Sequence, residues 1–238
     1  MIETAMLMAA GLGKRMRPLT ATRPKPLIKV AGQALIDHAL DRIEEAGIRR
    51  TIVNVHYLAD AIEAHLKSRA RRTGADYLIS DERSLLLETG GGLTKALPLL
   101  GDKPFLCANS DNLWINGPVD SIRALGQRWD DEAMDALLLM IPHARATGHK
   151  GPGDFRMDPR GRLSRRLPGK IAPFVFTGIQ ILSPRLITDP PAEIFSTNIF
   201  WDRAIAAGRA YGFAHPGLWF DVGTPEAIPL VEAEIGNG

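Results

Sequence analysis

Apolar and polar positions follow two alternating patterns along the first 140 residues. Short apolar or β-branched runs, typical of buried strands, occupy residues 4–10, 51–55, 77–79, 105–108 and 136–141. Between them, apolar residues recur at helical spacing, which predicts helices near residues 35–46, 58–66, 92–100 and 119–129. Strands that alternate with helices predict an α/β fold, in which a mostly parallel sheet is covered by helices on both faces.

The second half of the chain has a different pattern. Residues 155–158 and 162–165 flank a turn at residues 159–161, which predicts a hairpin. Strands at residues 174–182 and 218–222 and a helix at residues 199–207 follow, and Thr224 and Pro225 are expected to begin a closing helix. Because no linker or repeat separates the halves, we expect one domain over residues 1–238. Residues from about 141 to 238 would form a smaller lobe on the sheet of residues 1–140.

Composition narrows the classes of function. The 29 basic and 27 acidic side chains leave a net charge of +2, which argues against a basic face that coats nucleic acid. The sequence has no apolar segment near the roughly 20 residues that span a bilayer, and no signal-peptide pattern. We therefore expect a cytoplasmic protein without nucleic-acid or membrane partners. The single cysteine, Cys107, lies in an apolar run and is expected to pack in the core.

The stretch between residues 8 and 30 is the first candidate for chemistry. Gly11 and Gly13 follow the first predicted strand, and five cations come directly afterwards: Lys14, Arg15, Arg17, Arg23 and Lys25. Prolines at positions 18, 24 and 26 prevent a helix. A glycine turn followed by a stiff basic loop suits a polyanion. The P-loop pattern does not occur, and Met16 replaces the third glycine of the dinucleotide fingerprint.

Five blocks together resemble the sugar nucleotidyltransferases, which join a nucleoside triphosphate to a sugar 1-phosphate and release pyrophosphate. The blocks are G-x-G-x-R-M-x-P-L-T (residues 11–20), P-K-P-L (24–27), E-T-G-G-G (88–92), N-S-D (109–111) and W-F-D-V-G-T (219–224). The resemblance runs from one end of the chain to the other. It implies a Rossmann-like three-layer sandwich with a mostly parallel central sheet and a small sugar-binding lobe.

Within this family, the E-T-G-G-G block, the G-D-F of residues 153–155 and the W-x-D-V-G-T ending resemble short bacterial uridylyltransferases of cell-wall recycling. That similarity implies UTP and N-acetylmuramate 1-phosphate as substrates. Guanylyltransferases that act on mannose or heptose 1-phosphate are also similar and are the alternative. An alternative of another class is a nucleotide-sugar-binding regulator without turnover, although such a binder has no need of a metal pair. The sequence leaves homo-oligomerisation open.

The triphosphate site is expected in the opening loop. Two unit charges about 4 Å apart cost roughly 4 kcal/mol at an effective dielectric near 20, so joining two phosphates requires cations. Arg15 suits bidentate contacts with the β- and γ-phosphates, and Lys25 suits the α-phosphate. Glu88 can accept from uracil or from guanine, which leaves the base open. The nucleotide-binding candidates are Ala10, Gly11, Gly13, Lys14, Arg15, Lys25, Glu88, Gly91 and Asn109.

A metal site is expected at two aspartates. Asp111 and Asp221 each follow a predicted strand, which places them at the carboxyl edge of the sheet, where open α/β folds bind ligands. Mg²⁺ prefers one or two carboxylates together with phosphate oxygens. We therefore expect the pair to hold Mg²⁺, and we expect Asp111 to be catalytic together with Arg15 and Lys25. The family usually has glycine before the first metal aspartate, where this chain has Ser110.

The sugar side is less well marked, because the E-K-P motif of the larger family is missing. Asp154, Gly178 and Asn198 are the candidates for contacts with the sugar. N-acetylmuramate carries a lactyl carboxylate besides its phosphate, and burying that carboxylate unpaired would cost several kcal/mol. The candidate cations for these acidic groups are Lys150, Arg156, Arg165, Arg166 and Lys170.

Overall fold

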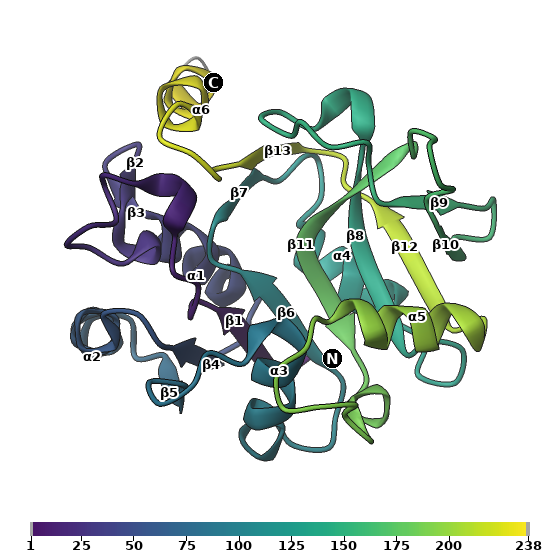
Figure 1. The fold of residues 1–238 in the computed structure, drawn as a ribbon, viewed down its shortest axis with the longest axis horizontal. Coiled ribbons are helices and arrows are strands. Elements are labelled where there is room, and N and C mark those ends of the chain that lie inside the picture. Colours follow the sequence, from purple (N-terminus) through teal and green to yellow (C-terminus); the bar gives the residue numbers. More distant parts are fainter. Residues whose placement is uncertain (1, 237–238) are drawn as a thin grey trace.

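The computed structural model describes residues 2–236, which contain one nine-stranded sheet, two small sheets and six α-helices (Figure 1). The large sheet contains β1 (Thr4–Met8), β4 (Arg50–Val55), β5 (Asp76–Asp81), β6 (Phe105–Asn109), β8 (Ala136–Pro142), β9 (Phe155–Met157), β10 (Leu163–Arg165), β11 (Phe174–Leu182) and β12 (Ala210–Ala214). The small sheets pair β2 (Lys29–Val30) with β3 (Gln33–Ala34), and β7 (Asn112–Ile115) with β13 (Leu218–Asp221).

The helices are α1 (Leu35–Glu45), α2 (Ala59–Thr73), α3 (Glu88–Leu100), α4 (Ser121–Arg128), α5 (Asn198–Ala206) and α6 (Ala227–Gly236). In the described part of the chain, none of them combines the length and the apolar character needed to cross a bilayer.

The order of the strands brings both halves of the chain into one sheet. The main order is β12-β8-β11-β6-β1-β4-β5, and the β9–β10 hairpin joins the start of β11. Strands β6, β1, β4 and β5 are parallel, β8 and β12 are parallel, and β11 runs antiparallel to both groups. The predicted α/β fold with a mostly parallel sheet is confirmed.

Two hydrophobic cores lie on opposite faces of this sheet. Along β1, Ala5 and Leu7 belong to the core under α1, α2 and α4, whereas Met6 belongs to the core under α3 and α5. Figure 1 shows α3 and α5 in front of the sheet and α4 behind it. Cys107 packs in the second core, where burial raises the pKa of its thiol to about 12, so the predicted packing role is confirmed.

The structure differs from the predicted elements at several places, among them the short strands β2 and β3, which were not predicted, and α2, which continues to Thr73. Helix α3 begins at Glu88, four residues before its predicted start, because the small glycines of residues 90–92 let another segment pack against its first turn. Strands β7 and β12 were not predicted, since they are short and their pairing partners are distant in sequence. Helix α6 begins at Ala227, two residues after Pro225.

A third core joins the two ends of the chain. Met16 from the opening loop packs with Phe220 of β13, with Val222 just after that strand and with Val231 of α6. Figure 1 shows α6 and β13 close to the N-terminal β2–β3 hairpin. The last block of the sequence therefore lies against the first.

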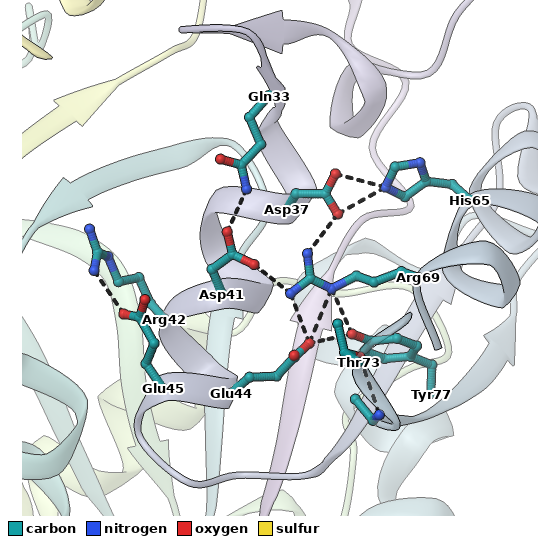
Figure 2. Close-up of polar contacts among 11 residues, drawn as sticks. Gln33, Asp37, Asp41, Arg42, Glu44, Glu45, His65, Arg69, Thr73 and Tyr77 are labelled. Atoms are coloured by element: carbon teal, nitrogen blue, oxygen red, sulfur yellow. Dashed lines mark hydrogen bonds and ion pairs between the residues drawn. The ribbon is translucent and has the colours of Figure 1, made fainter. Parts of the chain in front are cut away.

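A buried arginine joins α1 to α2 (Figure 2). The Arg69 side chain is 4% exposed and contacts Asp37, Asp41 and Glu44 at 3.1, 2.5 and 2.9 Å, and the Tyr77 hydroxyl at 2.7 Å. Burial disfavours the charged guanidinium, but the hydrogen bonds to Asp41, Glu44 and Tyr77 outweigh it and raise the pKa of Arg69. Its Tyr77 lies at the start of β5, so the network is at the opposite end of that strand from the carboxyl edge of the sheet.

Arg69→Met should lower the free energy of unfolding by about 3–5 kcal/mol, because it leaves buried carboxylates without their cation. Arg71→Met, on the same helix and exposed, is the matched control and should change stability by less than about 0.5 kcal/mol. Urea unfolding at pH 7 measures both. Equal stabilities of the two variants would contradict the role given to Arg69.

Candidate active site

The loop after β1 is fixed by short-range and long-range contacts. The Ala9 amide donates to Asn54 Oδ1 at 2.7 Å, which ties the loop to β4. Gly13 has a φ of +59°, and a Cβ there would lie 2.9 Å from Thr20 Cγ2 and 3.0 Å from Lys25 Cβ. The Thr20 hydroxyl donates to the Gly13 carbonyl at 2.9 Å. Glycine at position 13 therefore lets the loop fold back on itself and bring Lys25 to the end of the sheet.

Lys25 and Asp111 form an ion pair at the end of β6. Lys25 is 8% exposed, and its Nζ lies 2.7 Å from Asp111 Oδ2. Ser110 donates to the Met8 carbonyl from its amide at 3.1 Å and from its hydroxyl at 2.8 Å. The serine that stands where the family usually has glycine thus ties β6 to β1, and Asp111 projects from the joined strand ends.

A cavity of about 230 Å³ opens beside this ion pair, and we name it the nucleotide cavity. Its lining includes the candidates Ala10, Gly11, Lys25, Glu88, Asn109 and Asp111. A Cβ on Gly11 would meet open space, so glycine leaves room for a ligand there. Lys14 is exposed in the short 3-10 helix Lys14–Met16, and within residues 2–236 it does not line the nucleotide cavity.

The glycines of the E-T-G-G-G block lie in the first turn of α3. The amides of Gly90 and Gly91 both donate to the Phe195 carbonyl, at 2.8 and 3.2 Å. A Cβ on Gly90 would lie 2.5 Å from the Phe195 ring, and one on Gly91 would lie 2.2 Å from the Glu193 carbonyl. Gly91 therefore packs against residues 193–195, which accept its amide, and in the described part of the chain it is not among the residues that line the nucleotide cavity.

Asn54 and Glu82, which the sequence analysis did not select, also line the nucleotide cavity. Glu82 is fully buried; the Asn54 side chain donates to its Oε1 at 2.8 Å, and the Leu87 amide donates to its Oε2 at 3.1 Å. With the Ala9 contact, this chain of hydrogen bonds joins the opening loop to the start of α3. The available signal was an asparagine within the apolar run of residues 51–55.

Asp221, at the end of β13, lies in the same polar environment as Asp111. Burial and then the charge of Asp111 raise the pKa of Asp221, whereas the cations of Lys25 and Arg15 lower it. A Cβ on Gly223 would lie 3.0 Å from Arg15 Nη1 and 3.0 Å from Asp221 Oδ1. The Arg15 guanidinium therefore lies beside the Asp221 carboxylate, and not in the lining described for the nucleotide cavity.

Two further cavities meet at Asp221. The sugar-side cavity, of about 190 Å³, is lined among others by Asn109, Asp111, Asp154, Gly178 and Asp221. The basic cavity, of about 260 Å³, is lined among others by Arg15, His149, Lys150 and Asp221. Within residues 2–236, no group of three or more His, Cys, Asp or Glu side chains is placed to hold a metal ion, so Asp111 and Asp221 remain a two-carboxylate candidate.

Gly178 shapes the sugar-side cavity. It has a φ of +83° in β11, and a Cβ there would lie 2.0 Å from Asn112 Nδ2 and 2.9 Å from Asn109 Nδ2. Asp154 is oriented by the Phe176 amide, which donates to its Oδ2 at 2.8 Å. Because Gly178 has no side chain, the side-chain amides of Asn109 and Asn112 can both line the cavity. Asn112 was not selected from the sequence.

Asn198 has a structural contact where the sequence analysis expected a sugar contact. It begins α5, and its Oδ1 and its carbonyl each accept from the Arg165 guanidinium at 3.0 Å. Arg165 also donates to Asp202 Oδ1 at 2.7 Å and lies over the Phe155 ring. In the described part of the chain, neither Asn198 nor Arg165 lines the three cavities, because they bind each other beside the hairpin.

The other candidate cations are also separated by the fold. Arg166 donates to the Lys170 carbonyl at 3.1 Å, within its own loop. Arg156 and Lys170 line a separate cavity of about 400 Å³, and none of its described lining residues belongs to the three cavities around Asp111 and Asp221. Lys150 is the candidate that the fold brings to Asp221.

Comparison with known proteins identifies the family. A family model described as nucleotidyl transferase matches residues 4–149. N-acetylmuramate alpha-1-phosphate uridylyltransferase of Caulobacter vibrioides is 44% identical over 236 residues, which cover 99% of this chain and 98% of the relative. The chain belongs to the nucleotidyl transferase family. A protein of the same name from Neisseria meningitidis is 35% identical to the present chain over 234 residues, which cover 98% of both proteins.

The fold of this nucleotidyltransferase also matches solved structures. A UDP-glucose pyrophosphorylase complexed with UDP-glucose aligns with a TM-score of 0.81 over 100% of this chain and 99% of its own, at 15% identity. At that identity the likeness concerns the fold alone. Together, the comparisons confirm the resemblance to sugar nucleotidyltransferases and the predicted enzyme class.

Proposed function

We propose that the protein transfers the uridylyl group of UTP to N-acetylmuramate 1-phosphate and releases pyrophosphate. Membership of the nucleotidyl transferase family supports the reaction class, and the names of the two relatives support this base and this sugar. The observation that carries the proposal is the position of the two aspartates: Asp111, paired with Lys25, lies at the junction of the nucleotide and sugar-side cavities, and Asp221 lies at the junction of the sugar-side and basic cavities. Such a junction can bring two phosphate-bearing substrates together.

In the proposed reaction, a phosphate oxygen of the sugar 1-phosphate attacks the α-phosphorus of UTP. The bond between that phosphorus and the oxygen that bridges to the β-phosphate breaks, and pyrophosphate leaves with the electron pair. Positioning and charge compensation are sufficient for this chemistry. Lys25 would hold the α-phosphate at the edge of the nucleotide cavity, and Arg15 would hold the outer phosphates beside Asp221.

Mg²⁺ is part of the proposal. Asp111 and Asp221 would hold it, since Mg²⁺ prefers one or two carboxylates together with phosphate oxygens. Their fit is supported by the raised pKa of Asp221, which burial and the charge of Asp111 produce and which a cation would relieve. When bound, Mg²⁺ supplies positive charge for the reacting phosphates.

The proposal is tested by measuring pyrophosphate release with UTP and GTP, each paired with N-acetylmuramate, N-acetylglucosamine and mannose 1-phosphates in the presence of Mg²⁺. The expected result is the highest kcat/KM for UTP with N-acetylmuramate 1-phosphate. A highest value for GTP with mannose 1-phosphate would replace the substrates by those of a guanylyltransferase. Nucleotide-sugar binding without turnover of any pair would indicate a regulator.

A further inference from the structure

Lys150 lies on a loop that is tied to the end of β13. The Asp221 amide donates to the Thr147 carbonyl at 3.2 Å, and Thr147 forms a parallel bridge with Phe220. Gly148 follows with a φ of +83°, and a Cβ there would lie 3.0 Å from the Asp221 carbonyl. Glycine at position 148 therefore lets the loop pass closely over the strand, which holds Lys150 beside the proposed metal aspartate.

The basic cavity next to this loop suits an anion. Arg15 and Lys150 contribute two cations to its lining and Asp221 one carboxylate. The other lining residues are Gly148, His149, Gly151, Gly223, Thr224 and Ala227. A Cβ on Gly151 would lie 2.7 Å from His149 Nε2, so glycine there leaves room for the imidazole. Among the described residues, Lys150 has no ion-pair partner. A hydrogen bond from its own amide and, to a smaller extent, the Lys150 charge lower the pKa of the exposed Glu226, but Lys150 is not held in an ion pair within residues 2–236, so its ammonium can contact a ligand.

We infer that Lys150 binds the phosphate of the sugar 1-phosphate. The basic cavity shares Arg15, His149 and Asp221 with the sugar-side cavity, so an acceptor whose sugar lies near Asp154 can extend its phosphate toward Lys150. The outer phosphates of the triphosphate already have Arg15 as their cation. This inference rests on the proposed function, because it requires a sugar 1-phosphate as acceptor.

The test compares Lys150→Met with Lys150→Arg and with Lys170→Met, a matched control whose cation lies in the separate cavity. With the substrate pair that the wild-type enzyme turns over best, Lys150→Met should raise the KM of the sugar 1-phosphate by about 10- to 100-fold, the value of one charged hydrogen bond. Lys150→Arg should recover most of this loss, and Lys170→Met should match the wild type. Calorimetric binding of pyrophosphate, measured in parallel, should change less than about threefold.

Three results would overturn the inference. An unchanged KM would remove Lys150 from the site. A loss of pyrophosphate affinity as large as the rise in KM would assign it to the leaving group. A rise confined to N-acetylmuramate 1-phosphate, absent with N-acetylglucosamine 1-phosphate, would assign it to the lactyl carboxylate. The test uses whichever nucleotide and sugar phosphate the wild-type enzyme turns over best. If these are not UTP and N-acetylmuramate 1-phosphate, the proposed function is wrong, and the role of Lys150 is still decided by the KM of the sugar phosphate that is used.

Discussion

Asp221→Asn should lower kcat by about 1,000-fold or more while the protein remains folded, because the reacting phosphates lose their charge compensation. The proposed Mg²⁺ site has two carboxylates, and an amide in place of one of them removes half of its negative charge. Asp111→Asn should have an effect of the same size. Steady-state kinetics at saturating Mg²⁺ and a calorimetric titration with Mn²⁺ measure turnover and metal binding separately.

The two variants should differ in stability, which separates loss of function from loss of fold. Burial and the charge of Asp111 raise the pKa of Asp221, so its ionised form opposes folding at neutral pH, and Asp221→Asn should leave the protein as stable as the wild type or more so. Asp111→Asn removes the partner of the buried Lys25 and should lower stability. Asp102→Asn, at an exposed position, is the control for both. Full Mg²⁺-dependent turnover in either folded variant would remove that aspartate from the metal site.

Lys25→Met should lower kcat by about 100- to 1,000-fold, with a smaller change in the affinity for the triphosphate. The reason is that Nζ of Lys25 lies at the edge of the nucleotide cavity, where we place the α-phosphate on which charge builds in the transition state. Arg15→Met should mainly raise the KM of the triphosphate, since the outer phosphates are charged before the reaction. Steady-state kinetics for each variant measure both quantities.

Lys29→Met is the control for the Lys25 prediction, because Lys29 is an exposed cation just after the opening loop. This substitution should leave both kcat and KM unchanged. An increase in KM with unchanged kcat in Lys25→Met would show that Lys25 acts in uniform binding and would contradict its role in the transition state.

Most of the fold could be predicted because its elements have local signatures. Successive residues of a strand point to opposite faces, so Ala5 and Leu7 pack in one core and Met6 in the other. Because helices cover both faces of the sheet, the inner positions of the strand are all apolar, and the sequence shows this as a continuous apolar run. The start of α3 was misplaced because it depends on a contact with a distant segment and has no local signature. Three consecutive glycines favour a loop locally. Phe195, more than a hundred residues away, packs against this segment, and its carbonyl accepts hydrogen bonds from the amides of Gly90 and Gly91.

The sequence by itself determined the local geometry of the opening loop and selected the two aspartates as candidates. Gly13, Thr20 and Lys25 act within one short segment, so their spacing carries their geometry. Asp111 follows β6 of the parallel sheet, as expected, whereas Asp221 ends β13, which pairs antiparallel with β7 in a separate small sheet, where Asp221 lies opposite Asn112. Local spacing was therefore sufficient for the opening loop, whereas the position of Asp221 depends on the pairing of β13 with β7, which the sequence pattern did not predict.

Only the tertiary structure decided which polar side chains reach these aspartates. Arg165 and Lys150 are equally basic and lie in the same half of the chain, yet Arg165 binds Asn198 and Asp202, whereas the contact between Thr147 and Asp221 brings Lys150 to the site. Glu82 likewise reaches the nucleotide cavity through pairing of β4 with β5. Such neighbours are set by contacts between segments far apart in the chain, and the spacing of residues within a segment carries no information about them.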